Sequence, residues 1–148
     1  MQTLIPHIYV SNAAGAIDFY KAAFGAKENS RNMAPDGKRI MHADLEILGS
    51  TLMLNDDFPE MCGGKSQTPE AFGGSPVILN LVVDNANDVF AKATAAGATV
   101  TMPLADMFWG DRYGHLRDPY GHTWAIIQHL QQKSREEIEA AMKQTFKM

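Results

Sequence analysis

The stretch Val10-Ser11-Asn12-Ala13 recurs in the second half of the chain as Val83-Asp84-Asn85-Ala86. Each copy opens a helical run that stops at the same dipeptide, Gly25-Ala26 in the first half and Gly97-Ala98 in the second. The copies are 73 residues apart, about half of the chain. That period is too long for a solenoid repeat and suits one supersecondary unit used twice, in which each half needs the other to bury its apolar face. Two such sheets enclose a cavity, and cavities bind ligands.

Composition limits the classes of protein to consider. With 148 residues, 45% apolar and 20% charged, the chain has the size and balance of a single globular domain. A net charge of −4 without a long basic run argues against a nucleic-acid surface. Cys62 is the only cysteine, which excludes a disulfide framework and indicates a reducing compartment. No apolar run approaches the ~18 residues of a membrane helix, and residues 1–10 lack a signal peptide pattern, so we expect a soluble cytoplasmic protein without a membrane partner.

Hydrophobic periodicity and turn residues divide each half into a strand, a helix and three further strands. The short turns between the last three strands make them antiparallel, and the helix covers one face of the sheet, which leaves the other face to line a groove. We therefore predict an α+β fold. The expected elements are strand 4–10, helix 12–24, and strands 27–33, 39–47 and 51–55, then strand 77–83, helix 86–96, and strands 99–107, 112–117 and 122–129.

Alternation along the strands assigns side chains to faces. Leu4, Ile8 and Val10 share one face of the first strand, with His7 and Tyr9 on the other. In strand 39–47 the helix-facing set is predicted to be Met41, Ala43, Leu45 and Ile47, opposite His42 and Asp44.

Two segments lie outside the repeated units. Residues 56–76 are rich in Gly, Pro and Ser and form a long connection, which is typical of a lid or a plain linker. Ser134-Arg135-Glu136-Glu137 has capping-box spacing, and apolar residues then recur at helical intervals up to Phe146. This end helix covers either the protein's own core or a partner subunit.

The repeated unit, ending in Asp118-Pro119-Tyr120-Gly121-His122-Thr123-Trp124, resembles the vicinal oxygen chelate superfamily of glyoxalases, bleomycin-resistance proteins and dioxygenases. Residues 40–45, 52–54 and 102–114 resemble its PhnB-like branch. The resemblance covers about residues 3–130. It implies one domain over 1–130, with βαβββ modules at about 3–56 and 76–130 that form a cup, a helical tail over 131–148, and a homodimer.

The metal enzymes of that superfamily hold a divalent ion on the first and fourth strands of each module. Alignment with them places the four ligand positions at Ile5, Met53, Ile78 and Ala125. A divalent ion needs imidazole nitrogen or carboxylate oxygen at about 2.0–2.2 Å, which none of these side chains supplies. Met53 suits a soft ion such as Cu(I), but a single thioether among aliphatic neighbours makes no site. We therefore expect neither a metal nor a cofactor.

The polar side chains that share the groove face are His7, Tyr9, His42, Asp44 and Asn80. These five residues and Met53 are the ligand-binding residues that we predict on the strands. A relocated metal site built from His7, His42, Asp44 or His115 is the alternative interpretation.

Aromatic residues surround the predicted turn at Gly110-Asp111. Phe108, Trp109 and Tyr113 either wall an apolar pocket or fill the end of the core, and His115 shares the face of Tyr113 if Leu116 packs on the helix. The first role would add Phe108, Trp109, Tyr113 and His115 to the ligand-binding residues. Two further predictions are that Asp111 pairs with Arg112 at the turn and that His122 and His129 are surface residues at strand ends.

Three functions are compatible with these patterns. The first is a metal-free small-molecule-binding protein that sequesters its ligand, with catalytic residues unknown. The second is a metal-dependent lyase, dioxygenase or thiol transferase with relocated ligands. The third is a dimeric interaction module in which the cup is vestigial. No Ser/His/Asp or Cys/His arrangement and no phosphate-binding Gly-rich loop is suggested by the local pattern.

Overall fold

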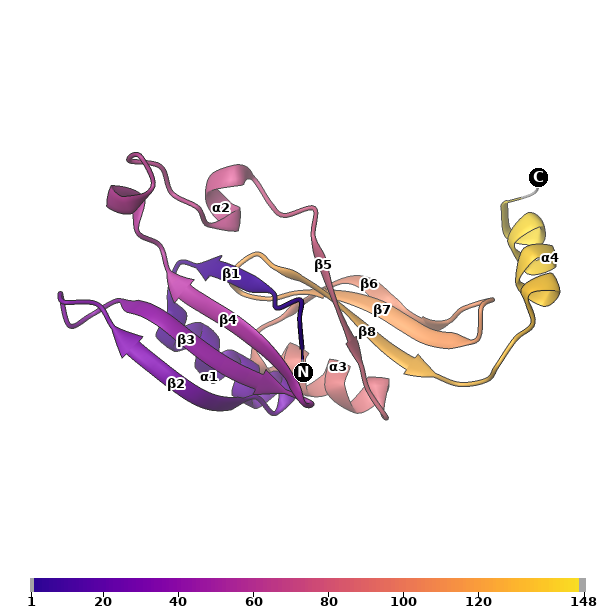
Figure 1. Ribbon diagram of the computed structural model, residues 1–148. Coiled ribbons are helices and arrows are strands. Elements are labelled where there is room, and N and C mark those ends of the chain that lie inside the picture. The colour runs from indigo at the N-terminus through magenta and orange to yellow at the C-terminus, as the bar shows by residue number, and fades with distance from the viewer. Residues whose placement is uncertain (1, 147–148) are drawn as a thin grey trace.

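The computed structural model describes residues 2–146, and each half contains a strand, a helix and three strands, as predicted (Figure 1). The first module comprises β1 (His7–Val10), α1 (Ala13–Phe24), β2 (Lys27–Met33), β3 (Ile40–Ile47) and β4 (Ser50–Asp56). The connection carries a 3-10 turn, η1 (Pro59–Met61), and a short helix, α2 (Pro69–Phe72). The second module comprises β5 (Ile78–Val82), α3 (Ala86–Ala96), β6 (Thr99–Asp106), β7 (Asp111–Arg117) and β8 (Thr123–His129), and α4 (Arg135–Phe146) follows.

The two modules have the same sheet topology. The strand orders are β1-β4-β3-β2 and β5-β8-β7-β6, with the first strand of each module parallel to the fourth and the other pairs antiparallel. His7 lies opposite Met53 in the first sheet, and Asn80 lies opposite Ala125 in the second. The predicted α+β fold of two βαβββ modules followed by a C-terminal helix is confirmed.

Matching caps start the two module helices. The Asn12 side chain accepts a hydrogen bond from the Gly15 backbone N–H at 3.1 Å, and the Asn85 side chain accepts one from Asp88 at 3.0 Å. Each asparagine satisfies an N–H that the first helical turn leaves without a partner. Gly25 ends α1 in the left-handed conformation, at φ 69°. The repeated sequence thus encodes the same helix boundary twice.

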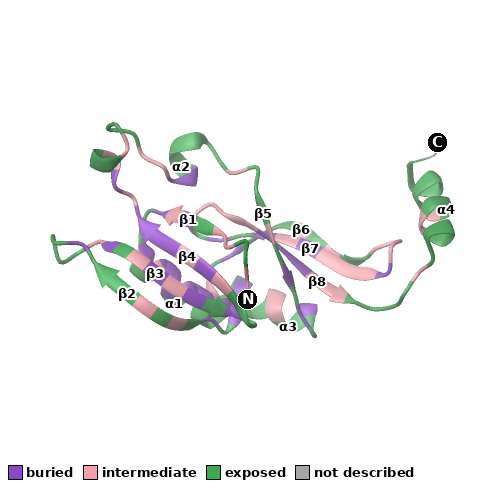
Figure 2. Cartoon of the chain, in the orientation of Figure 1, coloured by how far each residue is buried: buried purple, intermediate pink, exposed green. Residues whose placement is uncertain are grey.

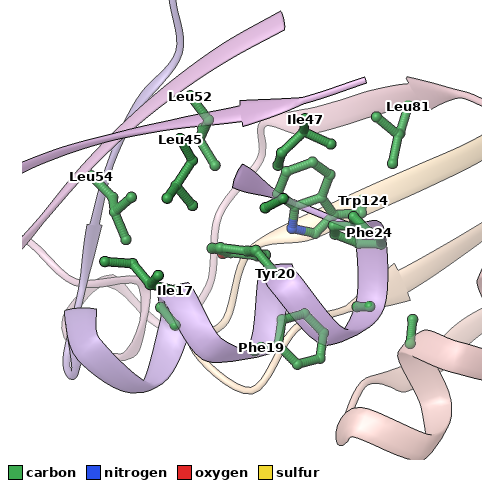
Figure 3. Close-up of a cluster of buried hydrophobic side chains, with 14 of the residues drawn as sticks. Ile17, Phe19, Tyr20, Phe24, Leu45, Ile47, Leu52, Leu54, Leu81 and Trp124 are labelled. Atoms are coloured by element: carbon green, nitrogen blue, oxygen red, sulfur yellow. The ribbon is translucent and has the colours of Figure 1, made fainter. Parts of the chain in front are cut away.

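One hydrophobic core joins the modules. The helices α1 and α3 contact each other beneath the sheets (Figure 1). Tyr20 and Phe24 of α1 pack on Trp124 of β8, with ring centroids 5.4 and 4.7 Å apart (Figure 3). Because these rings come from both halves, neither module buries its apolar face alone.

Two predictions about side-chain facing were wrong. The strand β1 starts at His7, so Leu4 precedes it and is 85% exposed. In β3, Ile40 is fully buried while Met41 is exposed, because a register shift between Asn32 and Met33 of β2 breaks the alternation at this point. A bulge of this kind places one extra residue in the ladder and reverses the expected faces.

The C-terminal helix stands apart from the sheets at the end of an extended segment (Figure 1), and its surface is mostly exposed (Figure 2). The predicted capping box is present: Glu137 N–H donates to Ser134 Oγ at 3.1 Å, and Ser134 N–H donates to Glu137 Oε1 at 3.4 Å. The predicted tail ran to residue 148, and residues 147 and 148 lie outside the described part. No helix within residues 2–146 is long and apolar enough to cross a membrane.

Candidate ligand-binding site

The open face of the first sheet, opposite α1, carries a polar cluster. His7 Nε2 is hydrogen-bonded to Asn55 Oδ1, and the His7 and His42 rings meet edge to face with centroids 5.7 Å apart. His42 Nε2 lies 3.0 Å from Asp44 Oδ1, and Ser30 Oγ donates to Asp44 Oδ2 at 3.2 Å. Each histidine therefore has a side-chain oxygen partner, which orients its ring.

Tyr9 lies where this cluster meets the connection between the modules. Its ring stacks on His7, with centroids 6.0 Å apart. Partial burial, followed by the neighbouring Cys62 thiol and Asp57 carboxylate, raises the pKa of Tyr9 above its ordinary value. A cavity of about 280 Å³ beside it is lined by both His7 and Gln67, so the connection covers this end of β1.

His122 joins the modules at the same place. Its Nε2 donates to the Tyr9 carbonyl oxygen at 2.8 Å, across 113 residues of sequence. The prediction that His122 is a surface residue at a strand end was therefore wrong, because its ring is part-buried and holds β1. His129, the other residue of that prediction, is exposed.

The four family metal positions do not form a metal site in this chain. Ile5 precedes β1, Ile78 begins β5, and Ala125 is fully buried. Met53 lies between His7 and Asp44 in the ladder, rather than among aliphatic neighbours as expected. Aliphatic and thioether side chains offer no ligand for a hard divalent ion. Within residues 2–146, no group of three or more His, Cys, Asp or Glu side chains is placed to hold a metal ion.

Four aromatic rings form a ladder that runs from the β6–β7 turn onto the open face of the second sheet. Successive ring centroids lie 5.0, 5.6 and 5.1 Å apart, with interplanar angles of 89°, 73° and 65°. The rings belong, in order, to Phe108, Trp109, Tyr113 and His115. Leu116 is buried on the helix side, so His115 takes the opposite face, as predicted. All four residues are half-buried, which leaves ring surface exposed to solvent.

Hydrogen bonds fix the ladder. His115 Nε2 lies 2.8 Å from the Tyr113 hydroxyl, and Trp109 Nε1 donates to Asp111 Oδ2 at 3.0 Å. Asp111 Oδ1 is 3.1 Å from His129 Nδ1. The predicted pairing of Asp111 with Arg112 was wrong, because Arg112 binds the Asp106 carboxylate at 2.7 Å. Neighbours in a strand point to opposite faces, so the guanidinium reaches the adjacent strand instead.

The structure places the predicted site residues in two groups and leaves Asn80 outside both. The first sheet carries His7, Tyr9, His42, Asp44 and Met53 on its open face, and the β6–β7 hairpin carries the four ladder residues. Asn80 lies on β5 and lines a cavity of about 430 Å³ that Pro6 and Leu52 bound on the side of the first module. Among the hydrogen bonds and ring contacts of residues 2–146, none joins the polar cluster to the ladder.

A buried carboxylate that sequence reasoning missed links the two halves. Asp118 is 4% exposed and accepts hydrogen bonds from the Tyr20 hydroxyl at 2.5 Å and from Trp124 Nε1 at 3.0 Å. Its other oxygen accepts the backbone N–H groups of Tyr120 and His122. The Asp-Pro-Tyr-Gly turn was the available signal, since an aspartate that begins a turn bonds to backbone two residues on.

Comparisons with known proteins agree with this architecture. The model of the family described as the Glyoxalase/Bleomycin resistance protein/Dioxygenase superfamily matches residues 3–126. The Mb0911c protein of Mycobacterium bovis is 52% identical over 139 residues, which cover 94% of this chain and 91% of that protein. The crystal structure of TioX from Micromonospora sp. ML1 is 29% identical, with a TM-score of 0.67 over 88% of this chain and 100% of its own. The PhnB protein of Bacillus cereus, 16% identical with a TM-score of 0.62 over 86% and 99% of the two chains, shows likeness of fold alone.

Proposed function

Because the chain belongs to the glyoxalase/bleomycin resistance protein/dioxygenase superfamily, we propose that it is a PhnB-like protein that binds and sequesters a small planar aromatic molecule without a metal. The observation that carries this proposal is the half-exposed ladder from Phe108 to His115. The four aligned metal positions support it, since their side chains cannot hold the superfamily's ion.

The ladder suits a flat ligand. Its rings meet edge to face, an arrangement in which aromatic groups attract one another, and their exposed surface can pack against another planar ring. Ring faces also attract cations, and the Asp111 carboxylate beside Trp109 adds negative charge. We therefore expect aromatic cations to bind more tightly than neutral aromatics of the same shape. The single cysteine suits a reducing compartment, and we propose the cytoplasm as the place of this activity.

A second copy of the chain is part of the proposal. Ile78 and Val82 of the edge strand β5 are 43% and 67% exposed, and an exposed apolar edge strand invites pairing with another chain. Sizing by light scattering tests for the homodimer. A monomer at all concentrations would contradict it, and it would also exclude the interaction-module hypothesis.

Calorimetric titration with N-methylacridinium, a flat permanent cation, tests the binding proposal. Replacing Trp109 by Leu should weaken binding about fivefold, the loss expected for an aromatic stacking partner of about 1 kcal/mol. Phe72→Leu is the control, since Phe72 is 69% exposed on α2 and lies outside the ladder. Equal affinities of the two variants would contradict the ladder as the site, and no heat from the wild-type protein would contradict the proposal itself.

The polar cluster supports a second candidate function. His7 and His42 have ring centroids 5.7 Å apart, and Asp44 is bonded to His42, so three groups of metal-binding type share one face. No three such side chains within residues 2–146 are placed to hold an ion, so a metal-dependent enzyme with relocated ligands would need this cluster to rearrange, with His115 as a further candidate. Metal analysis after purification without chelators decides between the two candidates. A stoichiometric divalent ion that disappears in His7→Ala would overturn the metal-free proposal.

A further inference from the structure

A cavity lies between the β6–β7 turn and the C-terminal arm, which we define as residues 130–146. Its volume of about 540 Å³ is within the range of small-molecule sites. The lining residues are Asp106, Met107, Phe108 and Gly110 from the turn, and Leu130, Gln131, Lys133 and Thr145 from the arm. Since Phe108 is also the first ring of the ladder, the cavity continues the exposed aromatic surface.

The arm is attached to the turn that carries the ladder. The Gly110 carbonyl oxygen accepts the N–H groups of Leu130 and Gln131, at 3.0 and 3.1 Å. Gly110 has a φ of 106°, and a Cβ there would lie 2.2 Å from the Gln131 carbonyl oxygen. Only glycine permits both this backbone conformation and this close approach. The root of the arm therefore has a fixed position relative to Phe108 and Trp109.

Core packing does not account for the position of α4. None of its described residues is buried, although Ile138 and Ala141 on one side are half-buried. Thr145, in the last turn of the helix, lines the cavity opposite the β6–β7 turn. An amphipathic helix normally gains its stability by burying its apolar side. Here that side adjoins a cavity instead of the core.

We infer that the C-terminal arm is the outer wall of the ligand site, and that a planar aromatic cation lies between the ladder and the last turn of α4. This inference rests on the proposed function and adds a wall to the site. The cavity lining holds one carboxylate, of Asp106, which is paired with Arg112, and one ammonium group, of Lys133, so its charges do not attract a cation. The arm therefore acts through shape, by covering a face of the ligand that the ladder leaves in water.

Filling the cavity from the arm tests the inference. Thr145→Trp places a large ring in the cavity, whereas Gln144→Trp adds the same ring at a neighbouring position of the helix that does not line it. Both sites are exposed, so both variants should fold. We expect Thr145→Trp to weaken binding of N-methylacridinium about tenfold relative to Gln144→Trp, measured by calorimetry. Removal of residues 134–148 should also weaken binding, because one face of the ligand would then be in water.

The outcomes separate the inference from the proposal on which it rests. Equal affinities of Thr145→Trp and Gln144→Trp, with wild-type binding intact, would overturn the wall and leave the ladder as the site. Failure of the wild-type protein to bind would overturn both. Weakening in Thr145→Trp and in the truncated chain, with unchanged affinity in Gln144→Trp, would establish the arm as part of the site.

Discussion

The two modules share their internal connections but differ in what they bury. In both, an asparagine caps the helix, and the next residue donates its N–H to a side chain at the end of the fourth strand. Ala13 N–H donates to Asp56 Oδ1 at 2.7 Å, and Ala86 N–H donates to Gln128 Oε1 at 2.9 Å. Yet α1 has seven buried residues, from Ala13 to Phe24, and α3 has only two, Ala86 and Ala93.

The difference follows from the position of the aromatic residues. Tyr20 and Phe24 of α1 contact Trp124 from the other module, so α1 is covered both by its own sheet and by β8. In the second module only Trp124 joins these rings, and four other rings lie in the ladder from Phe108 to His115 instead. The first module therefore contributes most of the shared core, and the second presents the surface that we propose as the site.

Replacing one aromatic side chain on each helix by alanine should give the largest difference in the loss of unfolding free energy. Phe24 is 6% exposed among three other rings, and Phe24→Ala should cost about 4 kcal/mol of unfolding free energy. Phe90 of α3 is half-buried, so Phe90→Ala should cost about 2 kcal/mol. Urea unfolding measures both. Equal losses would contradict the unequal division of the core.

Removing the carboxylate that joins the modules should have the next largest effect. Asp118→Ala leaves the Tyr20 hydroxyl and the Trp124 N–H buried without their acceptor, which should cost about 3 kcal/mol. Tyr20→Phe removes only one of these bonds and should cost about 1 kcal/mol. Both losses are measured by urea unfolding. If Asp118→Ala unfolded at the wild-type midpoint, the modules would be held together by packing alone.

The fold was predictable because its signals are local and occur twice. Asn12, Gly25 and Asn85 fix helix boundaries through bonds within a few residues, and alternation defines strands regardless of tertiary context. The wrong predictions of side-chain facing occurred where tertiary contacts, rather than local sequence, determine the strand's pairing and its ends. Met41 is displaced by a bulge in the pairing of β2 with β3, and Leu4 lies beyond the end of its strand.

The site was predictable in part, for the same reason. The open-face positions of His42, Tyr113 and His115 follow from alternation, and the structure agrees. The partners of these side chains were not predictable, because they come from distant sequence. Asp118 meets Tyr20 across 98 residues, and the Gly110 carbonyl meets an arm that lies outside the repeat. A pattern of period two identifies a face but not the residue that packs on it.

The equivalent helix-start contacts provide a smaller test of the comparison. Asp56 is 7% exposed and accepts two backbone N–H groups, from Ala13 and Ile40, each at 2.7 Å. Its charge also favours the positive end of α1, so Asp56→Ala should cost about 2 kcal/mol. Gln128 is neutral and accepts one such bond, so Gln128→Ala should cost about 1 kcal/mol. Thermal unfolding compares the stability losses of the two variants. A larger loss in Gln128→Ala than in Asp56→Ala would show that the stronger contact lies in the second module.

Of the changes considered, alkaline pH should lower the free energy of unfolding by the smallest amount. Burial, together with the Asp118 carboxylate, holds the pKa of Tyr20 well above its ordinary value of 10.0. Above that value the unfolded chain loses the Tyr20 proton while the folded chain retains it, so the free energy of unfolding falls as pH rises, by about 1 kcal/mol per pH unit from this group. The effect should be absent below the ordinary pKa, where both states keep the proton. Urea unfolding at a series of pH values, with Tyr20→Phe as the control, measures it. The free energy of unfolding of the wild type should fall more steeply with pH than that of Tyr20→Phe. Equal slopes would mean that Tyr20 ionises as easily in the folded protein as in the unfolded chain. That result is incompatible with a buried bond to Asp118.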